Sequence, residues 1–202
     1  MKTSAIFLSL LMLLSFKTKE ISLTQAERDY AAKFLNETQQ GVMSSVKNLS
    51  EAQMKYKAAP DKWSVEECVK HIAATEKTLW TMVEGALKQP ANPEKRADIK
   101  LTDEQLVKGT EDRTNKIKTF DALKPENTPY KTLAEALASF KENREKLIAF
   151  VNTSKDDLRN HVSALPMGSY DAYQLILLIS AHTNRHMQQI EEVKADANFP
   201  KS

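Results

Sequence analysis

The sequence is poor in two residues that shape many small folds. It holds 4 glycines and 1 cysteine among 202 residues. The single cysteine, Cys68, excludes any intramolecular disulfide, so the fold must be stabilised by its core alone. Scarce glycine together with 28% charged residues favours helices joined by short loops over a sheet protein. A chain of this length is expected to form one domain with a sizeable core.

The chain also has no large excess of positively or negatively charged residues. The 29 Lys and Arg residues nearly balance the 27 Asp and Glu residues, and they are interspersed along the chain. A nucleic-acid interface would gather its basic residues into a patch or stripe. We therefore expect no nucleic-acid partner and a small-molecule substrate instead. The sequence leaves a homodimer open.

No apolar run has the length of about 20 residues that a transmembrane helix needs. The longest, residues 5–16, follows Lys2 and precedes the polar residues 17–20. This pattern is typical of a secretory signal. We expect a signal peptide over residues 1–19, a domain over residues 20–202, export to the periplasm or beyond, and no other stable membrane insertion. The cleavage site is poor, and the alternative is an apolar first turn packed onto a cytoplasmic domain.

Four segments combine helix-start signals with apolar residues at helical spacing. They cover residues 24–49, 64–89, 132–151 and 171–195. Four amphipathic helices of this length predict an all-α four-helix bundle. The expected buried side of the first helix carries Ala26, Tyr30, Phe34, Val42 and Val46.

The connection between the second and third helices is unusually long. Residues 89–131 are polar and carry four prolines, with a short charged helix expected near residues 102–119. This crossover is long enough to traverse the bundle, so the second and third helices can run parallel. A brief helical turn over residues 154–161 and a loop around residues 166–168 are expected before the fourth helix.

The histidines suggest a metal site. His182 and His186 are one turn apart on the apolar stripe of the fourth helix, so both imidazoles can reach one ion. The alternative is a pair of hydrogen-bonded core histidines. His71, at the edge of the apolar stripe of the second helix, would complete a three-nitrogen site with an open position. His161 is expected to be structural.

Four polar residues are candidates for a role beside that site. Glu67 and Glu76 are the acids nearest to His71 in sequence, and either could orient an imidazole or act as a base. Glu67 is equally explained as a helix-capping residue. Arg185 and Gln189 flank the histidine pair and could hold a polar or anionic substrate, or simply face solvent.

Two further positions restrict the chemistry. Thr183 follows the first histidine of the pair, where a zinc protease of the HExxH type requires glutamate, so that class does not fit. Cys68 lies one turn before His71 and could supply a thiolate ligand. Core packing is the alternative for Cys68, because it also lies on an apolar stripe.

Two motifs together resemble the DinB superfamily, including its YfiT-like branch. They are residues 63–72, with the sequence WSVEECVKHI, and the pattern His182-x-x-Arg185-His186-x-x-Gln189-Ile190. The resemblance covers residues 24–194. It implies a four-helix bundle with a long crossover between helices two and three. It also implies a divalent metal, often nickel or zinc, held by His71, His182 and His186, while manganese and iron stay open.

The resemblance also suggests what the site does. The wider superfamily includes thiol-dependent S-transferases that use bacillithiol or mycothiol, as well as mycothiol-dependent isomerases. We expect a metal-dependent enzyme that activates water for hydrolysis or related chemistry, since reduced thiols are scarce outside the cytoplasm. A cytosolic thiol transferase and a non-catalytic metal-binding module are the alternatives.

Overall fold

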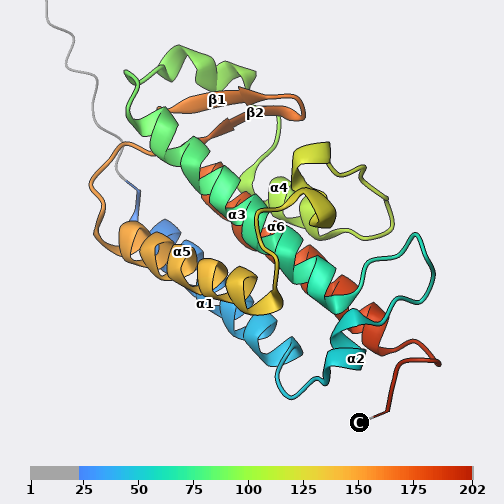
Figure 1. Cartoon of the computed structure of the whole chain (residues 1–202). Coiled ribbons are helices and arrows are strands. Elements are labelled where there is room, and N and C mark those ends of the chain that lie inside the picture. Colours follow the sequence, from blue (N-terminus) through green and yellow to red (C-terminus); the bar gives the residue numbers. More distant parts are fainter. Residues whose placement is uncertain (1–22, 202) are drawn as a thin grey trace, which may run out of the picture.

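The computed structural model describes residues 23–201 and confirms the four-helix bundle (Figure 1). The predicted signal peptide lies outside the described residues. The four long helices are α1 (Gln25–Ser45), α3 (Val65–Leu87), α5 (Leu133–Thr153) and α6 (Ala172–Lys194). The shorter elements are α2 (Glu51–Lys55), α4 (Asp103–Glu111), the 3-10 helices η1 (Pro93–Asp98), η2 (Asp121–Leu123) and η3 (Pro125–Asn127), and the strands β1 (Val162–Leu165) and β2 (Gly168–Asp171).

The helices begin where their capping residues predict. Thr24, Ser64 and Thr132 each form a complete capping box with the glutamate three residues later, which satisfies free backbone N–H groups at the helix start. α6 begins after Asp171, whose side chain accepts a hydrogen bond from the backbone N–H of Gln174.

Helices α3 and α5 run parallel, as the crossover predicts (Figure 1). Near the start of both helices, Lys70 donates a hydrogen bond to the carbonyl of Lys131. Near their ends, the rings of Trp80 and Phe150 pack edge to face at 5.0 Å. The chain therefore returns to the same end of the bundle through residues 88–132 before α5 begins.

Helix α1 runs antiparallel to α5 and parallel to α6. Arg28 at its start donates to the carbonyl of Val151, whereas Leu35 accepts from Arg144 earlier in α5. Tyr173 at the start of α6 donates to the carbonyl of Glu27. The bundle thus consists of two parallel pairs, α1 with α6 and α3 with α5, which oppose one another.

The apolar core has two parts with a polar layer between them. The first part includes Leu35, Leu79, Val83, Leu147, Val151, Ile176 and Ile179. The second includes Val42, Val65, Cys68, Ile72, Phe140, Ile190 and Val193. The fully buried ion pair of Arg144 with Glu76 lies between the two along α3 and α5. The predicted histidine site lies on the side of the second part.

The expected helical turn over residues 154–161 is wrong. These residues form turns and bends, and the following segment pairs as an antiparallel β1–β2 hairpin. The register places Leu165 opposite Gly168, so Pro166 and Met167 form a two-residue turn. Gly168 has a φ of 139°, a conformation that side-chain-bearing residues rarely adopt. A hairpin of only four residues per strand leaves too short an alternation pattern to be recognised.

Two other expectations need correction. The charged helix α4 covers only Asp103–Glu111, because the chain turns away at Asp112. Ala26 and Tyr30 are predicted on the buried side of α1, but both are exposed, Tyr30 to 48%. The buried face of that helix is instead formed by Ala31, Ala32, Leu35, Thr38 and Val42. Within residues 23–201, no helix combines the length and apolar character required to cross a bilayer.

Candidate metal centre

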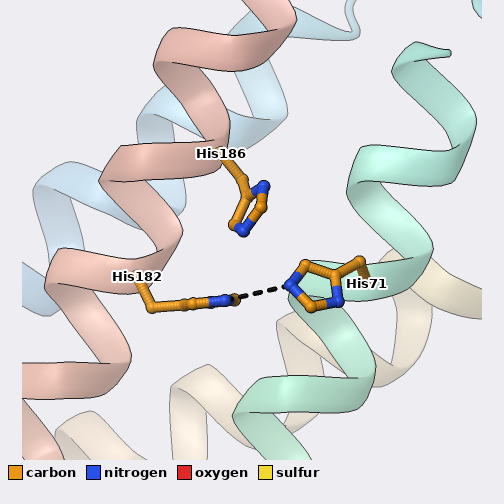
Figure 2. Close-up of side chains that lie close together, drawn as sticks. All are labelled: His71, His182 and His186. Carbon is orange, nitrogen blue, oxygen red and sulfur yellow. Dashed lines mark hydrogen bonds between the residues drawn. The ribbon is translucent and has the colours of Figure 1, made fainter. Parts of the chain in front are cut away.

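His71, His182 and His186 converge between α3 and α6 (Figure 2). One nitrogen from each ring can be chosen so that all three lie within 4.8 Å of one another. The Nε2 atoms of His71 and His182 are 3.0 Å apart, and the ring of His186 lies 4.4–4.5 Å from the other two rings, centroid to centroid. Metal–nitrogen bonds of about 2.0–2.1 Å place two ligand nitrogens of one ion roughly 3 Å apart. The spacing therefore suits a shared divalent ion.

A backbone carbonyl fixes the tautomer of His71. Its Nδ1 lies 2.7 Å from the carbonyl oxygen of Leu123, in η2. Because a carbonyl can only accept, Nδ1 of His71 carries the proton. The neutral ring then presents the lone pair of Nε2 toward the other two histidines. The crossover thus orients a ring on α3, and metal-binding histidines are usually oriented by such contacts.

Gln189 and Arg113 orient His186 in the same way. Nδ1 of His186 lies 2.9 Å from Oε1 of Gln189, and Nη1 of Arg113 lies 3.4 Å from the same oxygen. A guanidinium can only donate, so the amide atom facing both groups is the oxygen and Nδ1 of His186 is the donor. Nε2 of His186 therefore also keeps a free lone pair. Arg113 is itself held by two hydrogen bonds to Glu192.

Burial keeps the three rings neutral. It lowers the pKa of His71 to about 4, although the bond to Leu123 opposes that shift. Burial and the neighbouring imidazoles hold the pKa values of His182 and His186 well below the ordinary range. Metal binding requires neutral imidazoles, and all three rings are neutral at neutral pH. Among residues 23–201, the cluster contains no carboxylate or thiolate.

Trp63 forms one wall of the site. Its ring stacks on His186 at 5.7 Å with an interplanar angle of 22°, and it contacts His71 at 4.9 Å. His71 is only 3% exposed, so it is a buried residue rather than the boundary residue that its sequence position suggested. His182 is partly exposed.

The two candidate acids lie elsewhere. Glu67 completes the capping box with Ser64 and accepts a hydrogen bond from Lys57. Glu76 is buried and pairs with Arg144 at 2.6 Å. The structure gives both carboxylates partners outside the histidine cluster, so neither contacts an imidazole that it was expected to orient.

Of the remaining candidate residues, one contacts a histidine of the site and two lie outside it. Arg185 donates to the backbone carbonyls of Thr110, Asp112 and Asn115, so it anchors the end of α4 and the segment that follows. Gln189 contacts His186 directly, as described above. Cys68 is fully buried in the core, and burial raises the pKa of its thiol, which favours the packing interpretation.

His161 is structural, as expected. Its Nδ1 lies 2.7 Å from the carbonyl oxygen of Asp157 and its Nε2 lies 3.2 Å from that of Gln89, at the end of the bundle where α3 finishes. Three contacts of the site were not predicted from the sequence: the wall formed by Trp63, the support from Arg113, and the Leu123 carbonyl. Arg113 lies in an irregular polar segment with no periodic pattern, and a backbone carbonyl leaves no signal in the sequence.

A separate surface groove lies away from the histidines. An open groove of about 710 Å³ runs between α1 and α6 and is lined by Gly41, Ser44, Ser45, Asn184, Met187, Gln188, Glu191, Glu192, Lys194 and Ala195. None of the three histidines lines it.

Comparisons with known proteins identify relatives of this chain. A 160-residue stretch is 25% identical to the uncharacterized protein YuaE of Bacillus subtilis (strain 168), covering 79% of this chain and 94% of that protein. The fold is similar to that of YfiT from Bacillus subtilis, with a TM-score of 0.58 and 16% identity over 87% of this chain and 90% of that chain. YfiT is described as a probable metal-dependent hydrolase with an unusual four-helix bundle topology. The family model of the DinB superfamily matches residues 35–190, and the chain therefore belongs to the DinB superfamily.

Proposed function

We propose that this protein is a metal-dependent enzyme in which His71, His182 and His186 bind one divalent ion and a water is activated to hydrolyse a small substrate. The observation that carries the proposal is the convergence of three neutral imidazoles from α3 and α6. Two of them have their outer nitrogens fixed by Leu123 and Gln189, which leaves their inner nitrogens free. The description of YfiT as a metal-dependent hydrolase supports the same reaction class.

Three nitrogen ligands leave coordination positions open for water or substrate. A bound divalent ion lowers the pKa of such a water toward neutrality and so supplies a nucleophile. The chain supplies the rest of the site. Trp63 covers one side of His186 and limits water there, and Arg113 holds Gln189 so that the ring of His186 keeps its orientation.

The donor set bears on the choice of metal. Three imidazoles without a carboxylate or thiolate suit nickel or zinc better than magnesium or calcium, which prefer oxygen ligands. We propose nickel or zinc as the resident ion, with manganese and iron as alternatives. Elemental analysis of the freshly purified protein measures this directly. An ion bound at less than one tenth of the protein concentration after incubation with each metal would contradict the proposal.

An activity screen distinguishes a hydrolase, an S-transferase and a non-catalytic metal-binding module. The metal-loaded protein is screened with esters, with amides, and with a low-molecular-weight thiol paired with an electrophile. Hydrolysis without added thiol that disappears in His186→Ala supports the proposal. Turnover that requires the thiol assigns an S-transferase, and metal binding without any turnover across the screen favours a metal-binding module. His161→Ala is the matched control, because that histidine lies outside the site.

We further propose that residues 1–19 direct export and that the domain works outside the cytoplasm. The support is the basic start followed by the apolar run in the sequence. Cell fractionation with an antibody against the domain tests this. Recovery of the protein only in the cytosol would contradict export and would remove the main argument against a thiol transferase.

A further inference from the structure

The polar layer of the core centres on Arg144, which contacts all three other long helices. Its side chain is 0% exposed. The guanidinium bonds Glu76 of α3, the carbonyl of Leu35 and the hydroxyl of Thr38 on α1, and the hydroxyl of Thr183 on α6. An arginine has five N–H donors, and the one on Nε and the two on each terminal nitrogen all have an acceptor here. Every hydrogen-bonding group of the side chain is thus used.

One nitrogen of Arg144 joins the two helices that carry the histidines. Its Nη2 lies 2.6 Å from Oε2 of Glu76 and 3.0 Å from Oγ1 of Thr183. Glu76 follows His71 on α3, and Thr183 is the residue directly after His182 on α6. The planar guanidinium therefore sets the separation and the register of α3 and α6 next to the site.

Stability alone gives little reason for this arrangement. Two charges removed from water lose hydration, and apolar residues of similar volume in place of a buried ion pair are often neutral or stabilising. A buried and fully hydrogen-bonded pair does, however, select one relative placement of its helices. A metal site needs such selection, because its ligand nitrogens must keep their positions to within a few tenths of an ångström.

We propose that Arg144, with Glu76 and Thr183, positions α3 and α6 so that the three histidine nitrogens meet at one point, which makes Arg144 a positioning residue for the metal site. This inference rests on the proposed function, since it assigns a supporting layer to the same site. Arg144 contacts none of the histidines and acts through the helices. Its loss should lower metal affinity and change coordination geometry without removing a ligand.

Thr183 and Thr38 provide a matched pair of variants. Each hydroxyl accepts one hydrogen bond from Arg144, each donates to a carbonyl in the preceding turn of its own helix, and each residue is buried. Only Thr183 lies on a helix with metal ligands. Thr183→Val and Thr38→Val therefore each leave one N–H of Arg144 without its acceptor, and both should lower the folding stability by a similar amount. Only Thr183→Val removes the hydrogen bond between Arg144 and α6.

The experiment measures nickel and zinc affinity by chelator competition, the visible spectrum of the cobalt-loaded protein, and urea unfolding of the metal-free protein. We expect Thr183→Val to weaken metal binding by about tenfold and to shift the cobalt spectrum, as losses of supporting contacts around metal ligands do. Thr38→Val should bind within about twofold of the wild type. Arg144→Lys keeps the charge but loses the planar fork, so it should resemble Thr183→Val.

Equal metal affinity and identical cobalt spectra in Thr183→Val and Thr38→Val would overturn the inference. Arg144 lies on α5, which carries none of the three histidines. Wild-type metal affinity in a folded Arg144→Lys protein would also overturn the inference. If Arg144→Lys does not fold, the two threonine variants decide. A wild-type protein that binds neither nickel nor zinc would overturn the proposed function itself. A wild-type protein that binds metal with an affinity unchanged by Thr183→Val would overturn only the present inference.

Discussion

The Nε2 atoms of His71 and His182 lie 3.0 Å apart, although 111 residues separate them in the chain. Because the carbonyl of Leu123 holds the proton of His71 on Nδ1, neutral His71 must accept in this contact and His182 must donate. A divalent ion held by both nitrogens would replace this hydrogen bond, and His182 would then carry its proton on Nδ1.

Removing one imidazole should abolish tight metal binding while the bundle remains. His182→Ala or His186→Ala leaves two nitrogens, so we expect nickel or zinc affinity to fall by at least 100-fold. Helix content should persist, because the apolar core packs without these rings. Chelator competition and far-ultraviolet circular dichroism measure the two effects. Stoichiometric metal in the protein with both substitutions would show that the ion binds elsewhere.

Gln189→Leu should weaken metal binding without removing a ligand. The substitution deletes the acceptor for Nδ1 of His186, and losses of this kind typically lower metal affinity by about 10–100-fold. Gln188→Leu is the control, since Gln188 is exposed and bonds only the carbonyl of Glu111. Equal affinity of the two variants would mean that Gln189 does not orient His186.

The three histidines could be predicted from the sequence because their signal is local. His182 and His186 share one turn of one helix, and His71 belongs to a motif with recognisable caps. The helix starts were predictable for the same reason, since each capping box lies within four residues. The contacts of Leu123 and Arg185 could not be predicted. They involve backbone carbonyls in an irregular segment, whose positions depend on the whole crossover.

The positions of Arg144 and Glu76 in the sequence indicate that both are buried. Arg144 lies four residues after Phe140 and three before Leu147, and Glu76 has the same spacing from Ile72 and Leu79. Each charge therefore interrupts an apolar stripe. Two opposite charges in two stripes indicate a buried pair, because neither can be buried alone. Their partners Thr38 and Thr183 follow only from the three-dimensional arrangement.

The metal-free protein should lose stability as the pH falls from 7 to 5. The pKa of His71 is about 4 in the folded protein and about 6.5 when the chain is unfolded, so the unfolded chain binds more protons between these values. Stability is therefore complete above the unfolded pKa and declines through this window. For His71 alone the decrease should reach roughly 2 kcal/mol by pH 5.

Urea unfolding at pH 7, 6 and 5 measures this dependence. His71→Gln should flatten it, because the variant removes one of the three rings that burial keeps neutral. Saturating nickel or zinc should oppose the loss at pH 6, since an ion that binds only the folded state stabilises that state. Metal-free stability that stays constant from pH 7 to pH 5 would mean that the rings are accessible to protons in the folded protein.

Substitution of Gly41 on α1 tests how closely α1 packs against α6, and the same substitution of Gly85 on α3 is the control. Gly85 lies on an exposed face of α3, where an added Cβ would meet no atom of another described element within 4 Å, so Gly85→Ala should stabilise the protein by about 0.5–1 kcal/mol through helix propensity. At Gly41 an added Cβ would lie 2.0 Å from Cε of Met187. The methionine end must move into the neighbouring groove, and this loss of packing should offset the propensity gain. Urea unfolding of both variants and of Gly41→Ala/Met187→Ala measures the difference. A gain for Gly41→Ala as large as that for Gly85→Ala would show that Met187 does not pack closely over Gly41.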